Sequence, residues 1–345
     1  MTLYALIFLF PALMAIANIK LSSPLSKLYF YLYCFALIVF VGLRFENGVD
    51  WWNYLIFQRG YEDILFKEIF NDQDPGYGVL NWLSYKLFDG SIFFVNFVSA
   101  AFFITGLAIF SKAMPSPWLA LAISVSFLVI VMGMNYTRQS AALGFGLIAL
   151  TSLFKQKNVM FFVYMVLAIS FHKSAIVLLP LAIFGLKSRL IIFVAVVLMA
   201  PFLYYAFVST YIDAMLDLYL GSGGMDSSGA FVRVALNFVA SIFYLLYRKE
   251  LNLPPYIQTI FDAMAAINFL LFLMLFVFPS TTVIDRFALF FTPMQIFMFS
   301  ALPYIFRPFP LSAFIILIVY GAQLFIWLSF SVYAPLWIPY NFWIF

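Results

Sequence analysis

Residues 91–111 read SIFFVNFVSAAFFITGLAIFS, a stretch without a charged side chain. About 20 apolar residues are enough for a helix to cross the hydrocarbon core of a bilayer. Similar segments recur along the whole chain of 345 residues, of which 66% are hydrophobic and only 9% are charged. A water-soluble domain contains about 25% charged residues. The sequence therefore predicts an integral membrane protein, and it excludes a soluble enzyme, a nucleic-acid binder and a fibrous protein.

The apolar segments predict an all-α transmembrane bundle of about twelve spans, because open strand edges cannot face lipid. The whole chain, 1–345, is expected to form a single integral membrane domain. The first segment lacks a basic region before it, so we interpret it as a retained span with its N-terminus outside. The spans are placed at 3–19, 28–43, 91–111, 117–134, 138–154, 158–172, 174–186, 190–208, 231–247, 256–278, 287–305 and 310–333.

The charged residues of the connecting loops separate into two sides. One set of loops is rich in lysine and arginine, with Glu250 as its only acid. Basic loops of membrane proteins face the cytoplasm. The opposite side, which holds most of the acidic residues and the two long loops at about 44–90 and 209–230, is therefore the outer side. Long loops carry function more often than short ones, so we expect the site at the outer face.

Four arginines lie at or near the outer ends of predicted spans: Arg44, Arg138, Arg233 and Arg286. Any one of them could simply reach to the lipid headgroups from a helix end. Four on the outer side, however, run against the usual bias of positive charge. A guanidinium group binds phosphate oxygens through two parallel hydrogen bonds. The pattern therefore favours a lipid that carries a diphosphate as the ligand.

His172 is the only histidine of the chain, and it ends an apolar segment. It is either an interfacial residue without a chemical role or a general base, since histidine readily exchanges a proton near neutral pH. The only cysteine, Cys34, lies inside an apolar segment, so no internal disulfide can form. With one histidine and one cysteine, we expect no zinc site.

The first outer loop contains the sequence GVDWWNY at residues 48–54. Aromatic faces stack on the C–H surfaces of sugars while a carboxylate binds their hydroxyl groups, so Asp50, Trp51, Trp52 and Tyr54 are candidates for a sugar site. The alternative is that the aromatic residues form the belt at the membrane interface. That alternative explains the two tryptophans but not Asp50, which is also the second candidate for the general base.

The same loop contains Asp72-Gln73-Asp74. Two carboxylates at this spacing can bind a divalent cation through their oxygens. Three residues in a loop already rich in acids are weak grounds for a metal site. We therefore predict no metal and no cofactor, and we expect a chain without both carboxylates to keep most of its activity.

The order of these motifs resembles the EpsG-like and Wzy-type polysaccharide polymerases. The resemblance rests on three motifs and on Arg286: Arg44…Gly48-x-Asp50…Tyr54, Asn135-x-x-Arg138-Gln139-x-Ala141, and Phe171-His172-x-Ser174-Ala175. It runs from about residue 40 to about residue 290. It implies a fold like the multi-span C-type glycosyltransferases and a site at the outer face of the bacterial inner membrane.

The resemblance also implies the reaction and the partners. A growing glycan on undecaprenyl diphosphate would be the donor, and a single lipid-linked repeat unit the acceptor, without metal or nucleic acid. Arg138, Arg233 and Arg286 would stabilise the leaving diphosphate, and Asn135 would join the sugar site. Arg44 would bind the diphosphate or pair with Asp50. Membrane lipid and a chain-length regulator protein are further candidate partners.

Two alternative functions remain. An O-antigen ligase uses the same donor but transfers the glycan to the lipid A core, whereas the short outer loops and the motif set favour a polymerase. A lipid-linked oligosaccharide flippase or transporter would need polar groups near the bilayer midplane and paired repeats. Among the acidic residues, only Asp262 lies inside a predicted span, near its cytoplasmic end, and no repeat is visible.

Overall fold

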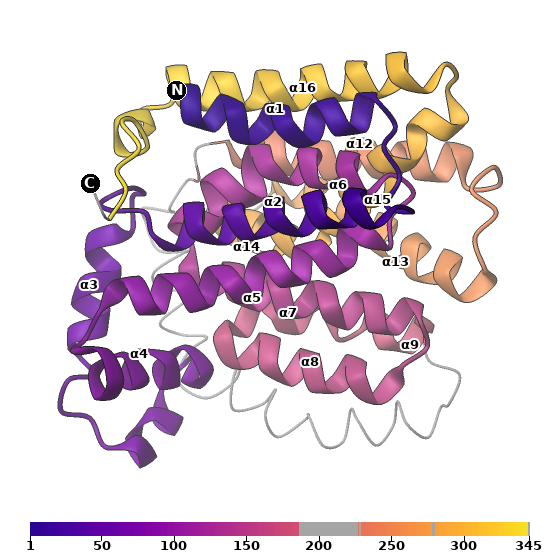
Figure 1. The fold of residues 1–345 in the computed structure, drawn as a ribbon. Coiled ribbons are helices and arrows are strands. Elements are labelled where there is room, and N and C mark those ends of the chain that lie inside the picture. The colour runs from indigo at the N-terminus through magenta and orange to yellow at the C-terminus, as the bar shows by residue number, and fades with distance from the viewer. Residues whose placement is uncertain (186–226, 228, 278–279, 344–345) are drawn as a thin grey trace. The chain divides into compact units, whose positions relative to one another are not determined.

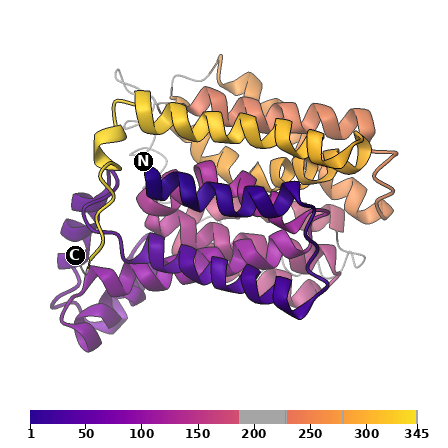
Figure 2. The same ribbon diagram turned by 45° about the horizontal axis from the view of Figure 1, so that its top comes forward.

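A computed structural model describes residues 1–185, 227, 229–277 and 280–343 of the chain. Every regular element within these residues is a helix, apart from an isolated β-bridge between Arg44 and Phe342 (Figures 1 and 2). The chain divides into two compact units. Unit 1 comprises Met1–Ile148, Leu167–His172 and Phe299–Phe345, and unit 2 comprises Ala149–Val166 and Lys173–Met298.

Unit 1 is built around one fully buried helix. This helix runs as α6 over Pro117–Ser124 and continues as a π-helix over Val125–Gly133. All side chains from Trp118 to Met134 are buried. A helix that is apolar all round is stable only when other elements cover it on every side. The neighbours of α6 are α1 (Thr2–Ile16), α5 (Ile92–Lys112) and α16 (Phe309–Phe330).

The remaining elements of unit 1 build its surface and carry the candidate site. α1 and α16 pack side by side in both views, and α2 (Pro24–Gly42) packs along α5 (Figures 1 and 2). In the chain, α2 is followed by α3 (Trp51–Arg59), a 3₁₀ helix (Phe66–Asn71) and α4 (Pro75–Phe88), which precede α5. The predicted outer loop at 44–90 is thus largely helical. Two helices cross the unit boundary, α7 (Thr137–Phe154) and α8 (Asn158–Phe171).

The chain after α16 returns to the loop that follows α2. The amide of Phe45 donates to the carbonyl of Asn341 over 2.9 Å, and the amide of Gly48 donates to the carbonyl of Leu336 over 2.9 Å. Further bonds between the two segments include those from Asn341 N to Asn47 Oδ1, from Trp343 N to the Leu43 carbonyl, and from Asn47 Nδ2 to the Pro339 carbonyl. Because each segment supplies the other's backbone partners, the loop at 43–48 is held by residues 336–343.

Unit 2 contains an antiparallel pair of long helices, α12 (Ala230–Tyr247) and α13 (Pro255–Met274). Their contact is partly polar, since Asn268 donates from Nδ2 to Ser241 Oγ over 3.1 Å. The unit also holds a 3₁₀ helix (Lys173–Leu178), α9 (Leu181–Gly185), α14 (Thr281–Ala288), a 3₁₀ turn (Leu289–Phe291) and the start of α15 (Thr292–Ile305). In the part of unit 2 that the structure describes, every regular element is a helix.

Within the described ranges, six helical stretches are long and apolar enough to cross a membrane: Pro24–Gly42, Ile92–Lys112, Ala230–Tyr247, Pro255–Met274, Thr281–Ile305 and Phe309–Phe330. The prediction of an all-helical membrane protein is therefore confirmed, but the prediction of about twelve spans is not. Other predicted spans in the described residues form helices that are shorter, as at Thr2–Ile16, or broken, as at Lys173–Gly185. The predicted span at 190–208 and most of the predicted loop at 209–230 lie outside the described residues.

Candidate active site

The site in unit 1 begins with the residue that precedes α4. Proline at the first position of a helix fits the helical φ angle and has no amide to leave unpaired, which explains the start of α4 at Pro75. An aspartate just before a helix commonly accepts a hydrogen bond from a first-turn amide. Asp74 makes no such side-chain bond. Its carboxylate, only 4% exposed, points instead toward Arg138 of α7 and toward His172, which follows α8.

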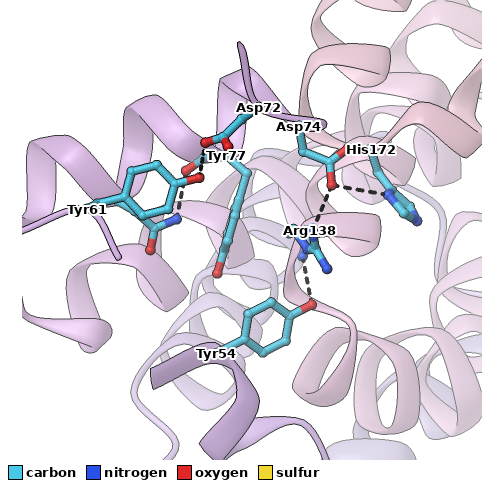
Figure 3. Close-up of polar contacts among 8 residues, drawn as sticks. Tyr54, Tyr61, Asp72, Asp74, Tyr77, Arg138 and His172 are labelled. Atoms are coloured by element: carbon cyan, nitrogen blue, oxygen red, sulfur yellow. Dashed lines mark hydrogen bonds and ion pairs between the residues drawn. The ribbon is translucent and has the colours of Figure 1, made fainter. Parts of the chain in front are cut away.

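One oxygen of this carboxylate lies close to two cationic or ionisable side chains. Asp74 Oδ2 is 2.9 Å from Nη1 of Arg138 and 3.6 Å from Nδ1 of His172. Figure 3 shows the carboxylate between the two side chains. Arg138 and His172 are separate candidates in the sequence, and the structure brings them together on Asp74.

Gly76 allows α4 to approach the end of α8. A Cβ atom added at Gly76 would lie 2.5 Å from Ser170 Oγ and 3.0 Å from a ring carbon of Phe171. Neither distance is compatible with an ordinary side-chain contact. The absence of a side chain at Gly76 therefore sets how closely Asp74 and His172 can lie.

Aromatic residues of α3 and α4 surround the guanidinium group of Arg138. Its Cζ lies 5.0 Å from the ring centre of Phe57 and 6.0 Å from that of Tyr54, and its amide donates to Tyr54 Oη over 3.4 Å. The rings of Tyr54 and Tyr77 meet edge to face at 5.9 Å. Burial raises the pKa of Tyr54 and of Tyr77, so both phenols stay neutral at physiological pH. The side chain of Arg138 is nevertheless 32% exposed, so a ligand can reach it.

The two carboxylates of the Asp72-Gln73-Asp74 triplet face different partners. Asp72 Oδ2 accepts a hydrogen bond from the hydroxyl of Tyr61 (Figure 3). Burial, followed by this hydrogen bond, raises the pKa of Tyr61. Within the described ranges, no group of three or more His, Cys, Asp or Glu side chains is arranged to hold a metal ion. The structure thus separates Asp74 from Asp72, and we no longer expect the two to be equally dispensable.

Asp50 lies in unit 1 against the start of α7. Its amide donates to Asn135 Oδ1 over 2.9 Å, and Asn135 Nδ2 donates back to Asp50 Oδ2 over 3.2 Å. Asn53 Nδ2 also donates to Asp50, at 3.3 Å. Gly48, with φ of +104°, brings this loop close to residue 134, because a Cβ there would lie 2.7 Å from the Met134 carbonyl oxygen. Asp50 and Asn135 thus hold each other, and their catalytic and sugar-binding roles stay predictions.

The two tryptophans of the first outer loop differ in exposure. Trp51 is buried and packs edge to face on Phe45 at 5.9 Å between ring centres. Trp52 is 61% exposed. Of these two candidates for a sugar-binding surface, only Trp52 presents a ring that a ligand can reach directly.

Arg44 is only 1% exposed and lies in the interior of unit 1. Its Nη1 donates to the Val41 carbonyl over 2.6 Å, and its Nη2 donates to Thr137 Oγ1 over 3.1 Å. Burial lowers the pKa of Arg44 to about 10, so the side chain keeps its charge at neutral pH. The predicted binding of diphosphate by Arg44 is untested, and these contacts instead give it a role in joining the end of α2 to the start of α7.

Arg233 and Asp285 form a buried ion pair in unit 2. Arg233 Nε donates to Asp285 Oδ1 over 2.7 Å, and Nη2 donates to Asp285 Oδ2 over 2.5 Å. Ser227 Oγ accepts from the same Nη2 over 2.7 Å and donates to Asp285 Oδ2 over 2.9 Å. Arg286 follows on α14 and is half-buried. The predicted diphosphate roles of Arg233 and Arg286 are untested, and the contacts of Arg233 point to a structural role.

Sequence reasoning missed Asp74 as a partner of Arg138 and His172. The sequence carries one usable signal, the Asp-Pro-Gly order at 74–76. Proline there starts a helix, and glycine allows a close approach of the carboxylate-bearing turn to another element. Neither residue identifies which helix is approached, so the contact with α8 could not be derived.

Apolar helices of spanning length and an arginine–carboxylate–histidine cluster define a helical membrane protein with a candidate catalytic site. The chain belongs to the EpsG family, whose model matches residues 27–342. No curated protein and no solved structure matches the chain. Membership of this family confirms the resemblance derived from the motifs and indicates a polysaccharide polymerase-type function in polysaccharide biosynthesis.

Proposed function

We propose that the protein is a polysaccharide polymerase that joins undecaprenyl-diphosphate-linked oligosaccharide repeat units at the outer face of the bacterial inner membrane. Three observations support this function: the EpsG family membership, the helices of spanning length, and the excess of acidic residues in the loops assigned to the outer side. Each of them is independent of the geometry of the candidate site.

In this reaction a hydroxyl oxygen of the acceptor repeat unit attacks the anomeric carbon of the donor glycan. A new C–O bond forms, the bond from the anomeric carbon to the diphosphate oxygen breaks, and the electron pair leaves with undecaprenyl diphosphate. His172 takes the hydroxyl proton as the general base. Arg138 stabilises the negative charge that develops on the leaving diphosphate. A single displacement of this kind inverts the anomeric configuration.

The observation that carries the proposal is the position of Arg138 and His172 beside one buried carboxylate of unit 1. The reaction needs a cation near the leaving group and a base near the attacking hydroxyl. These two groups must lie within one substrate's length of each other. Arg138 and His172 come from different helices, α7 and the end of α8, and both contact Asp74 Oδ2 within 4 Å.

The surrounding side chains supply a surface suited to sugars. Tyr54 and Phe57 flank Arg138, and Trp52 presents an exposed ring on the same helix, α3. Aromatic rings with neighbouring polar groups are typical of carbohydrate-binding surfaces. Asp50 is the alternative base, and it directly precedes α3 in the chain.

The test uses purified protein and radiolabelled undecaprenyl-diphosphate-linked repeat units in detergent. We expect a ladder of lengthened glycans and the release of undecaprenyl diphosphate, with the His172→Ala variant reduced about 100- to 10,000-fold. A wild-type protein that lengthens nothing in detergent but moves the lipid across a bilayer would be a transporter. Transfer only after lipid A core is added would indicate a ligase. Full activity of His172→Ala would make Asp50 the candidate base.

A further inference from the structure

We propose that Asp74 is the positioning residue for His172: it accepts a hydrogen bond from Nδ1–H and thereby leaves Nε2 as the atom that takes the acceptor's proton. This inference rests on the proposed function, because it assigns the base of that reaction a partner. Asp74 itself remains ionised and takes no proton.

The surroundings of the histidine ring support this arrangement. His172 Nδ1 is buried and makes no hydrogen bond within the residues described. A buried ring nitrogen without a partner is costly, and a catalytic role is one of the explanations for such a group in a native structure. The carboxylate oxygen 3.6 Å away lies just beyond hydrogen-bond distance. Contacts of catalytic groups are often long without substrate and shorten in the reactive complex.

The backbone around Asp74 and its contact with Arg138 place the carboxylate near Nδ1 of His172. Asp74 makes no side-chain bond to the first turn of α4, and its carboxylate contacts Arg138 of α7. The contact with Arg138, at 2.9 Å, fixes the position of Oδ2. Gly76 then allows the turn to lie against Ser170 and Phe171, the residues that precede His172. Three independent features thus direct one oxygen toward one ring nitrogen.

The proposal assigns a complete path to the proton. The acceptor hydroxyl gives its proton to Nε2 of His172 as its oxygen bonds to the anomeric carbon. The imidazole becomes an imidazolium ion, with a proton on each nitrogen. The negative charge of Asp74 stabilises this ion, as a carboxylate does for a histidine base in general. The proton leaves to water after undecaprenyl diphosphate has departed.

An alternative role for Asp74 is simply to neutralise Arg138. The two roles differ in what they require of the histidine ring. A carboxylate that only neutralises Arg138 has no influence on which ring nitrogen carries the proton. A carboxylate that positions His172 determines it, because the hydrogen bond of one nitrogen sets the tautomer.

The first experiment exploits the fact that His172 is the only histidine of the chain. Full-length protein labelled with ¹⁵N-histidine in lipid nanodiscs gives the ring signals of this residue alone. We expect the neutral ring of the wild type to carry its proton mainly on Nδ1. In Asp74→Ala, this preference should be lost. The same tautomer in the wild type and in Asp74→Ala would overturn the proposal, whether or not the protein shows polymerase activity.

The second experiment measures chain lengthening in Asp74→Asn, which keeps the size of the side chain and removes its charge. We expect a loss of about 100-fold or more, as for other changes that disable a general base. Asp74→Glu, which restores the carboxylate, should recover part of the rate. Asp72→Ala is the matched control, since Asp72 contacts Tyr61, and it should keep most of its activity and the wild-type tautomer. Wild-type activity of Asp74→Asn would contradict the proposal.

The two measurements separate failure of this inference from failure of the proposed function. A protein that lengthens no glycan but shows the shift of tautomer would support the Asp74–His172 pair and contradict the polymerase function. A protein that lengthens glycans and has the same tautomer with and without Asp74 would support the function and contradict the pair. Should Asp74→Ala not fold, Asp74→Asn serves for both measurements.

Discussion

In the residues described, each unit of the molecule contains a close pair of an arginine and a buried aspartate. In unit 2, Arg233 binds both oxygens of Asp285 and also donates to Ser227, and its side chain is only 8% exposed. In unit 1, Arg138 contacts Asp74 through a single nitrogen, Nη1, and is 32% exposed. The same two residue types therefore produce two different environments.

The difference indicates what each pair can do. The guanidinium group of a buried arginine can form two parallel hydrogen bonds to a carboxylate. Such a group cannot bind a phosphate through the same two N–H groups. A guanidinium held at one corner and open to solvent can still bind a phosphate oxygen. We therefore propose that the pair in unit 2 stabilises the structure of that unit and that the pair in unit 1 takes part in the reaction.

The largest effect is expected when the pair in unit 2 is broken. Asp285→Ala leaves the charge of Arg233 buried without its carboxylate, and removal of one partner of a buried pair costs about 3–5 kcal/mol. We expect a marked fall in the thermal denaturation midpoint of the detergent-solubilised protein. Fluorescence or light scattering during heating measures it.

The matched control replaces both members of the pair. Arg233→Met combined with Asp285→Leu removes the two charges together, and apolar replacement of a buried pair is often neutral or stabilising. This double variant should recover most of the lost stability. If Asp285→Ala is as stable as the wild type but inactive, the comparison fails and Arg233 becomes a candidate for diphosphate binding.

A smaller effect on stability, but a large one on activity, is expected in unit 1. Arg138→Lys keeps the charge and loses the fork, so a diphosphate should be bound and stabilised poorly. We expect chain lengthening to fall about 100-fold, as for other groups that stabilise charge in the transition state. Binding of undecaprenyl diphosphate should weaken, and the denaturation midpoint should change little.

The outcome that would contradict this assignment is a full-length polymer from Arg138→Lys on a gel. Arg138 would then be an interfacial anchor, and the difference in exposure between the two arginines would have no functional meaning. His172→Ala provides the comparison, because it should lose the chemical step while it still binds the lipid diphosphate.

The smallest effect is expected from removal of metal. Asp72 accepts a hydrogen bond from Tyr61, and Asp74 contacts Arg138 and His172. The carboxylates of the triplet thus face side chains of the protein. Chelation with EDTA should leave the rate of chain lengthening unchanged. A loss that magnesium or manganese restores would place a cation in unit 1 and replace the division of labour proposed for the two carboxylates.

The sequence alone predicted the helical class and selected Arg138 and His172, because both depend on local signals. Long apolar segments identify membrane helices, and rare polar residues at their ends stand out. The predicted number of about twelve spans is not confirmed, and one reason is that hydropathy reports burial as well as lipid contact. The segment from 117 to 134 is apolar since it is buried inside unit 1, and part of it forms a π-helix.

The partners of the charged residues could not be predicted for a different reason. Arg44, Arg138 and Arg233 look alike in sequence, as each lies near the end of an apolar segment. Their exposure ranges from 1% for Arg44 to 32% for Arg138. The sequence does not reveal this difference, because the exposure of each arginine depends on elements that are distant in the chain. Asp285 and Asp74 become partners only when those elements pack together. The charge pattern of the sequence identifies arginines as candidates for phosphate binding. The fold determines which of these arginines a ligand can reach.

The bonds between residues 43–48 and residues 336–343 impose an order on biogenesis. A ribosome releases the chain from its N-terminus, so the segment at 43–48 is made long before its partners. It must remain unpaired while every later helix is synthesised and inserted. Asp50 and α3 directly follow this segment. The sugar-binding surface proposed for α3 therefore reaches its final form only after residues 336–343 have been made, so shorter nascent chains lack this feature.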